Sequence, residues 1–111
     1  MCFGCECGDG WFMLLDELCS GLQWNTDKNG YPQVVAVQVK EKFGGLRFYY
    51  NAIGGEEDKR LERKVGCIDG RIGFAEAMSY KICEECGSTD DVTQSEGGWV
   101  YTRCAKCWEE E

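Results

Sequence analysis

The chain has 111 residues, and its 20 acidic against 12 basic residues give a formal net charge of −8. This charge disfavours non-specific binding to nucleic acid, because such binding depends on clustered cations. The chain has 43% apolar residues and a single proline, which is typical of a folded protein, and no apolar run approaches the roughly 20 residues of a membrane span. We therefore expect a small folded protein that does not enter a membrane.

The first predicted element is an amphipathic helix over about residues 11–22. Apolar residues recur there at helical spacing and form one stripe. The stripe consists of Trp11, Leu14, Leu15, Leu18, Cys19 and Leu22. Asp9 is placed to cap the first turn, and the polar residues 23–32 that follow are predicted to form a loop.

A β-hairpin is predicted next, with strands over about residues 34–40 and 46–51 joined at Phe43-Gly44-Gly45. Every second residue of each strand is β-branched, aromatic or otherwise apolar, which places these residues on one face. They are Val35, Val37 and Val39 in the first strand and Leu46, Phe48 and Tyr50 in the second.

A second helix is predicted over about residues 56–80. Its apolar stripe consists of Leu61, Val65, Ile68, Ile72 and Ala75. Gly66, Gly70 and Gly73 each cost about 1 kcal/mol in a helix interior, so we expect a break near Asp69-Gly70. The predicted fold class is α+β: two helices packed on a small antiparallel β-hairpin sheet in residues 1–80, followed by a C-terminal zinc ribbon in residues 81–111.

Four cysteines near the C-terminus have the spacing of a zinc site. Cys83 and Cys86 form one Cys-x-x-Cys pair, and Cys104 and Cys107 form the second. Four thiolates at this spacing predict one structural Zn²⁺ site, which has no open coordination position for catalysis. Gly87 follows the first pair directly, and we expect it to relieve backbone strain in the tight turn that brings Cys83 and Cys86 together.

The residues between the two pairs are predicted to form a hairpin, with strands over 92–95 and 99–103. Disulfides and a thioredoxin-like redox motif are the alternative interpretations of the cysteines. Both fit less well. The N-terminal residues do not show the charged-then-apolar pattern of a secretory leader, so we expect a reducing cytosol, where structural disulfides do not persist. A redox motif normally opens the helix of a βαβ unit, which is not predicted here.

The other cysteines raise the question of a second metal site. Cys2, Cys5 and Cys7 lie close together in the sequence, and Cys19 or Cys67 could complete an all-thiolate set. The alternative is that Cys19 and Cys67 are small buried apolar residues. A metal ratio of one per chain would exclude the second site.

A candidate interaction surface combines cations with aromatic rings. Its members are Lys42, Arg47, Tyr49, Trp99 and Arg103. Such a composition is common at interfaces, and single-strand binders also mix aromatic and basic residues. The alternative is that Phe48 and either Tyr49 or Tyr50 are core residues and that Gly44-Gly45 only makes the turn.

Catalysis is not expected. The chain has no histidine, which excludes Ser-His-Asp and Cys-His arrangements and removes the usual general base at neutral pH. It has no phosphate-binding glycine motif either. We therefore predict that the protein is not an enzyme.

Three segments carry a resemblance that covers nearly the whole chain. They are Cys7-Gly8-Asp9-Gly10-Trp11, the string from Lys40 to Tyr50 (KEKFGGLRFYY), and the two Cys-x-x-Cys pairs with Gly98-Trp99 between them. Together they resemble a group of small proteins encoded by bacteriophages and prophages. The resemblance implies a phage-type accessory protein in a bacterial cytoplasm, and it brings no catalytic residues.

Charge, size and resemblance together lead to two functional hypotheses. The first is a protein–protein interaction module that docks on a host or phage protein, as an inhibitor of a host defence or transcription complex. The second is a nucleic-acid-binding zinc ribbon that uses Arg47, Tyr49, Trp99, Arg103 and Lys106. The net charge favours a protein partner.

Overall fold

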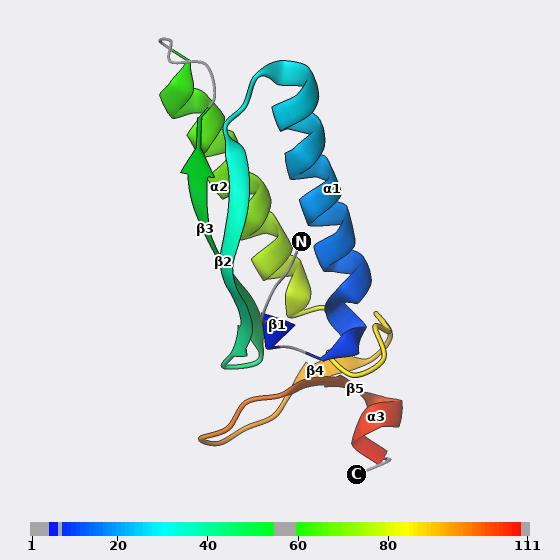
Figure 1. Ribbon diagram of the computed structural model, residues 1–111. Coiled ribbons are helices and arrows are strands. Elements are labelled where there is room, and N and C mark those ends of the chain that lie inside the picture. Colours follow the sequence, from blue (N-terminus) through cyan, green and yellow to red (C-terminus); the bar gives the residue numbers. More distant parts are fainter. Residues whose placement is uncertain (1–4, 7, 55–59, 110–111) are drawn as a thin grey trace.

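The computed structural model describes residues 5–6, 8–54 and 60–109 (Figure 1). The elements in chain order are β1 (Cys5–Glu6), a 3-10 turn η1 (Asp9–Trp11), α1 (Phe12–Asn29), β2 (Gln33–Lys42), β3 (Gly45–Ile53), α2 (Leu61–Ser79), β4 (Val92–Gln94), β5 (Thr102–Cys104) and α3 (Ala105–Glu109). The predicted α+β class is confirmed. Among the described residues, none of the helices combines the length and apolarity that crossing a bilayer would require.

The larger sheet contains the predicted hairpin and one additional strand. β2 and β3 pair antiparallel, and Lys42 faces Gly45 across a turn formed by Phe43 and Gly44. Both turn residues have positive φ, 54° and 80°, as a tight hairpin turn of type I′ requires. β1 pairs with β2 in the parallel direction, with Cys5 opposite Val39. The predicted antiparallel hairpin is therefore present, and the short parallel strand β1 was not predicted.

Because β2 contains a bulge, its three valines do not share one face as predicted. The register shifts between Ala36 and Gln38, and a bulge of this kind interrupts the alternation of side chains. Val39 is fully buried, whereas Val35 is 42% and Val37 57% exposed. Val34 and Ala36 pack against the core in their place.

The first helix is longer than predicted. It continues through residues 23–29, which are polar except for Trp24, and ends where Gly30 adopts a left-handed conformation with φ 69°, the usual geometry of a glycine C-cap. These polar residues were wrongly predicted to form a loop, since most of them lie on the exposed side of a helix. Asp9 is not a cap: it lies within η1, and no side chain caps the start of α1.

The second helix shows no break at Gly70. α2 is continuous from Leu61 to Ser79, because its glycines lie on the exposed side and its core-facing stripe is uninterrupted. A Cβ added at Gly66, Gly70 or Gly73 would meet no atom within 4 Å. The predicted start near residue 56 falls outside the described residues.

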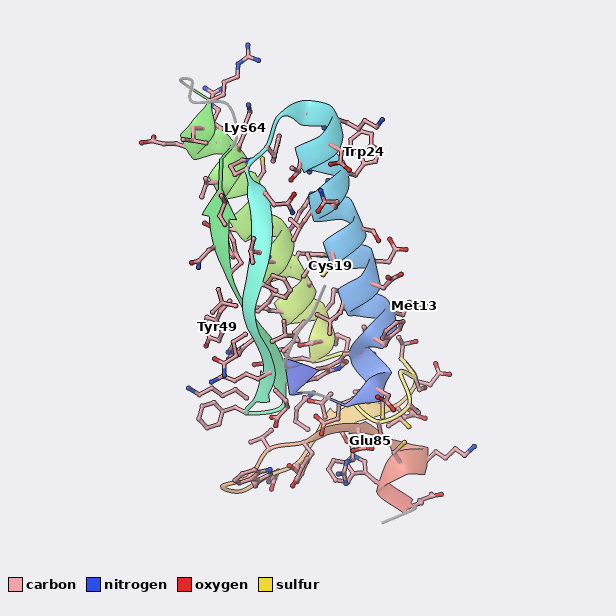
Figure 2. All side chains as sticks on the ribbon, viewed as in Figure 1. Met13, Cys19, Trp24, Tyr49, Lys64 and Glu85 are labelled. Atoms are coloured by element: carbon pink, nitrogen blue, oxygen red, sulfur yellow. The ribbon has the colours of Figure 1, made fainter. Side chains whose placement is uncertain are left out.

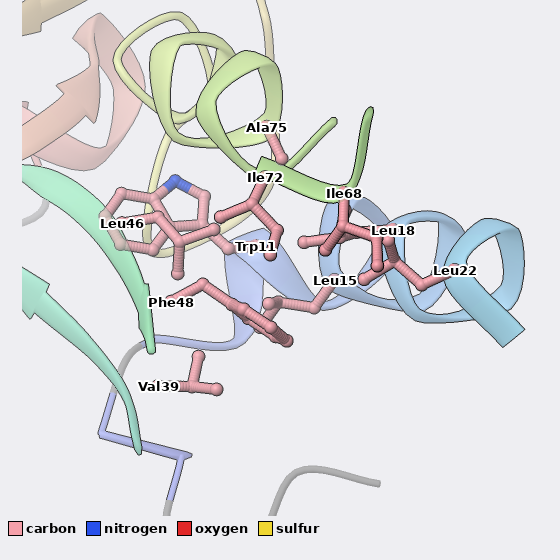
Figure 3. Close-up of a cluster of buried hydrophobic side chains, with 10 residues drawn as sticks. All are labelled: Trp11, Leu15, Leu18, Leu22, Val39, Leu46, Phe48, Ile68, Ile72 and Ala75. Atoms are coloured by element: carbon pink, nitrogen blue, oxygen red, sulfur yellow. The ribbon is translucent and has the colours of Figure 1, made fainter. Parts of the chain in front are cut away.

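The core lies between the two long helices and one face of the hairpin (Figure 3). Its buried apolar residues are Trp11, Leu15, Leu18, Leu22, Val39, Leu46, Phe48, Ile68, Ile72 and Ala75. Both helices lie on the same side of β2 and β3 (Figure 1). The opposite face of the hairpin has no covering layer among the described residues.

Ser79 joins the end of α2 to the hairpin, and its replacement tests that joint. The fully buried hydroxyl accepts the N–H of Leu46 at 2.8 Å and donates to the carbonyl of Glu76. Because Ser79→Ala leaves a buried N–H without a partner, we expect it to lower the free energy of unfolding by about 1–3 kcal/mol. Urea unfolding measures the change. The exposed Ser20→Ala is the control, and an equal loss in both variants would contradict the assignment.

Candidate metal centre

The four C-terminal cysteines converge on one point. The Sγ atoms of Cys83, Cys86, Cys104 and Cys107 all lie within 4.8 Å of one another. Cys83 and Cys104 are buried, Cys107 is partly exposed and Cys86 is exposed. The Sγ atoms of Cys86 and Cys104 are 3.6 Å apart, well beyond the roughly 2 Å of a disulfide. The cluster could hold a metal ion.

The first cysteine pair is shaped by local backbone hydrogen bonds. The N–H of Cys83 donates to the carbonyl of Ser88 at 2.8 Å, and the N–H of Gly87 donates to the carbonyl of Cys83 at 2.9 Å. Gly87 has a φ of 82°, which is strained for residues with a Cβ. The predicted role of this glycine is confirmed.

Glu84 joins the first cysteine pair to the second. Its N–H donates to the carbonyl of Thr102 at 2.9 Å, and its carboxylate accepts the N–H of Thr102 at 3.2 Å. The side chain is buried, and this burial raises the pKa of its carboxyl group. Glu84 therefore fixes the distance between the pairs. The spacing rule for cysteines gives no signal for this residue.

The ribbon hairpin is shorter than predicted. β4 and β5 pair antiparallel over residues 92–94 and 102–104, so residues 99–101 do not belong to the second strand. α3 follows β5 directly and carries Cys107, and this helix was not predicted. The second Cys-x-x-Cys pair thus spans the junction between a strand and a short helix.

Arg103 lies inside the ribbon, which corrects its placement on the interaction surface. The Cζ atom of its guanidinium lies 4.5 Å from the centre of the Tyr101 ring and 5.2 Å from the centre of the Trp108 ring. It also reaches the carboxylate of Glu85 at 3.5 Å, and only 12% of the side chain is exposed. Arg103 holds β5 and α3 to the first cysteine pair.

The thiols of the cluster differ in their readiness to ionise. Burial by itself would raise the pKa of Cys83, but backbone hydrogen bonds involving Cys104, Cys86 and Glu85 outweigh it and lower that pKa to about 7. Hydrogen bonds with Cys104 and Cys83 raise the pKa of Cys107 strongly. One thiolate therefore forms readily and hinders the ionisation of its neighbours. Four thiolates at this distance need a cation to balance their charge.

The glycines near the N-terminus allow the core to contact the first cysteine pair closely. The N–H of Gly10 donates to the carbonyl of Glu84 at 2.9 Å. A Cβ at Gly10 would lie 2.1 Å from the carbonyl oxygen of Cys83. The indole of the buried Trp11 donates to the carbonyl of Ile82 at 2.9 Å. The Gly8-Asp9-Gly10-Trp11 segment is thus a docking site for the ribbon.

The hairpin turn makes the second contact with the ribbon. The carbonyl of Gly44 accepts the hydroxyl of the buried Thr102, and a Cβ at Gly44 would lie 2.8 Å from the side chain of Val100. A Cβ at Gly45 would meet the ring of Tyr80 at 2.3 Å. The double glycine therefore does more than turn the chain: it allows close contact with the end of α2 and with β5.

The candidate second metal site falls largely outside the described residues. Cys2 and Cys7 lie there, and the side chain of Cys5, in β1, is not described. Cys19 is half-buried on α1, whereas Cys67 is exposed on α2 rather than buried as the alternative interpretation expected. Among the described residues, the C-terminal cluster is the metal-binding arrangement that the structure shows.

The remaining surface candidates are exposed to different degrees. Trp99 is 70% and Tyr49 45% exposed, and Lys42 is also exposed. Arg47 is half-buried, and its guanidinium donates to the carbonyl of Leu46 at 3.2 Å. Phe48 is a core residue and Tyr50 packs against the core, as the alternative interpretation of this string predicted.

Comparisons of the chain with protein-family models, with curated proteins and with solved structures gave no match. The resemblance to phage and prophage proteins therefore stays a prediction, and the function has to be inferred from the chain's own surfaces.

Proposed function

We propose that this chain is a zinc-stabilised protein–protein interaction module that docks through the outer face of its β2–β3 hairpin. The metal part of the proposal rests on the four cysteines. A tetrahedral Zn²⁺ with bonds of about 2.3 Å to sulfur places its ligand atoms about 3.8 Å apart, close to the 3.6 Å between the Sγ atoms of Cys86 and Cys104. Since all four positions are filled by protein, the zinc would be structural.

The observation that carries the docking proposal is the composition of the outer hairpin face. Apolar side chains are exposed there: Val35 (42%), Tyr49 (45%) and Ile53 (59%). Figure 2 shows Tyr49 on the side of the hairpin away from the helices. A sheet with one covered face usually presents polar residues on the other. Uncovered apolar area of this kind marks interaction sites.

The same face is basic, although the chain is acidic. Lys40 pairs across the strands with Arg47, and the Lys40 ammonium lies 5.7 Å from the centre of the Tyr49 ring. Glu41 is the one acidic residue of β2 and β3. It pairs with the buried Leu46, and its carboxylate accepts the N–H of Gly44 at 2.7 Å. The outer face therefore suits a partner with apolar and acidic residues.

The apolar residues favour a protein partner over nucleic acid. Lys40, Lys42 and Arg47 could neutralise about three phosphates, which gives a salt slope of only about −2 for a single strand. Valine and isoleucine side chains neither stack on bases nor contact phosphates. The resemblance to phage proteins makes a host or phage protein in the bacterial cytoplasm the proposed partner class, and a host defence or transcription complex would fall within it.

Affinity capture with the zinc-loaded protein tests this function. We expect a stoichiometric protein partner from bacterial lysate that survives nuclease treatment. The double variant Tyr49→Ser with Lys42→Glu should bind this partner at least ten-fold more weakly, because truncated aromatic anchors often cost about 2 kcal/mol. Titration calorimetry with the purified partner measures the change. Phe74→Ser, which removes a 69% exposed aromatic residue from α2, is the matched control.

Two results would contradict the proposal. Recovery of nucleic acid alone, lost on nuclease treatment, would make the hairpin and ribbon a nucleic-acid surface. Equal weakening of partner binding by the hairpin variant and by Phe74→Ser would move the docking site away from the outer face.

A further inference from the structure

A groove runs between the two long helices, and we call it the α1–α2 groove. Its volume is about 510 Å³, and all eight residues that line it belong to α1 or α2. Leu14 and Leu18 are on the α1 wall, and Phe74 is on the α2 wall. The described residues next to undescribed segments lie elsewhere: β1 is in the sheet, and Arg60 is about 10 Å along α2 from Cys67, where the groove begins.

Large apolar side chains are exposed along the α1–α2 groove. Phe74 is 69% exposed on the α2 wall. Met13 is 77% exposed and lies one helical turn before Glu17, which lines the α1 wall. Figure 2 shows Met13 on the side of α1 away from the hairpin. Gly70 lines the groove as well, and a Cβ added there would meet no atom within 4 Å. Protruding apolar groups beside a hollow are typical of an interaction surface.

The two walls of the α1–α2 groove carry opposite charges. Glu17 on α1 and Arg71 on α2 are the two charged residues that line it, and both are exposed. They lie at similar heights along the helices, because a Cβ added at Gly21, one turn after Glu17, would lie 2.6 Å from a guanidinium nitrogen of Arg71. An occupant with one sign of charge would match one wall and be repelled by the other.

We propose that a second copy of this chain occupies the α1–α2 groove and that the two copies form a dimer with two-fold symmetry. An axis parallel to the helices places α1 of one copy over α2 of the other. Glu17 then faces Arg71 of the other copy at two symmetric positions, and Phe74 packs against Leu14 of the other copy. An axis perpendicular to the helices would instead bring each helix to its own counterpart and like charges together. The charges therefore select a four-helix arrangement with α1 opposite α2.

The length of the helices limits the strength of this dimer. α1 has 18 residues and α2 has 19, so each is about 27–28 Å long. Two such helices about 9 Å apart offer a face of roughly 500 Å², whereas stable specific interfaces bury about 600–1,000 Å² on each partner. We therefore expect a weak dimer with a Kd of about 10–100 μM. The inference does not rest on docking at the outer hairpin face, which stays uncovered in this dimer.

Sedimentation velocity of the zinc-loaded protein tests the proposal over about 1–300 μM, a range that spans the expected Kd. We expect the monomer to convert to a dimer across this range. Glu17→Arg and Arg71→Glu should each weaken self-association at least about ten-fold, because the symmetry places like charges opposite one another twice. A mixture of these two variants should associate again, since both pairs between the unlike copies then carry opposite charges.

Asp16→Arg is the matched control, because it makes the same charge change at the neighbouring exposed position, which does not line the α1–α2 groove. It should change self-association less than about two-fold. A parent protein that stays monomeric over the whole range would overturn the proposal. So would equal weakening by Glu17→Arg and Asp16→Arg, or a mixture of the two groove variants that stays monomeric, since an ion pair within one copy would explain that result. Tyr49→Ser should leave the dimer unchanged, which separates this site from the outer face.

Discussion

Cys83→Ser is expected to abolish metal binding and to unfold the ribbon around the cysteine cluster. Cys83 is fully buried, and its substitution removes one of the four converging thiols that could hold a metal ion. Structural zinc contributes about 10–16 kcal/mol of apparent binding energy in small domains, as much as the whole stability of a typical protein. Removal of the metal by a chelator should have the same effect. Metal analysis and segment-resolved hydrogen exchange measure both results.

The ribbon's contacts imply that its loss also weakens the core. Trp11 donates to Ile82, and Thr102 donates to Gly44, so the core would lose one part-buried and one buried hydrogen bond to the ribbon. The exposed Cys67→Ser is the control and should retain the metal. A Cys83→Ser protein that keeps both its metal and its thermal midpoint would contradict the assignment. A ratio of one zinc per chain in the parent protein would exclude the second site, and a ratio of two would revive it.

Periodic patterns predicted the elements that contribute the core. The stripe from Trp11 to Leu22 is buried or partly buried where helical spacing places it, and Ile68, Ile72 and Ala75 of the α2 stripe lie in the core. Leu61 and Val65 of the α2 stripe are only partly buried. The end of α1 could not be predicted from periodicity, because its last residues are mostly solvent-exposed and only Gly30 marks the stop. The bulge at Ala36 and Gln38 was equally hidden, since β-branched residues fit either face of an exposed strand.

The four cysteines of the candidate site could be predicted from the sequence, but the residues that position them could not. The spacing of the two cysteine pairs brought together the four residues that converge. Glu84 and Thr102 connect the pairs through hydrogen bonds between residues 18 apart, and neither residue type is a metal ligand in this arrangement. The glycines before Trp11 were visible as a motif. Their role depends on a backbone contact with the ribbon that local sequence patterns do not encode.

Gly10→Ala and Gly66→Ala are expected to change stability in opposite directions. A Cβ at Gly10 would lie 2.1 Å from the Cys83 oxygen and 2.6 Å from the carbonyl carbon of Glu84. Both contacts are with backbone, so no side chain can move aside. We expect a loss of about 3 kcal/mol or more, at the upper end of overpacking. Gly66 lies within α2 with no atom within 4 Å of an added Cβ, so alanine should add about 0.5–1 kcal/mol through helix propensity.

Thermal unfolding of the zinc-loaded protein measures this pair, because 1 kcal/mol shifts the midpoint by about 4–8 °C in a chain of this size. The Gly10→Ala protein should also release its metal more readily, since the displaced carbonyl belongs to the ligand Cys83. If Gly10→Ala were as stable as the parent, the Gly8-Asp9-Gly10-Trp11 segment could not be the close contact that joins core and ribbon. If Gly66→Ala were destabilising as well, the cause would be a general intolerance of alanine. Opposite signs would show that the contact with Cys83 and Glu84, rather than backbone freedom, requires glycine at position 10.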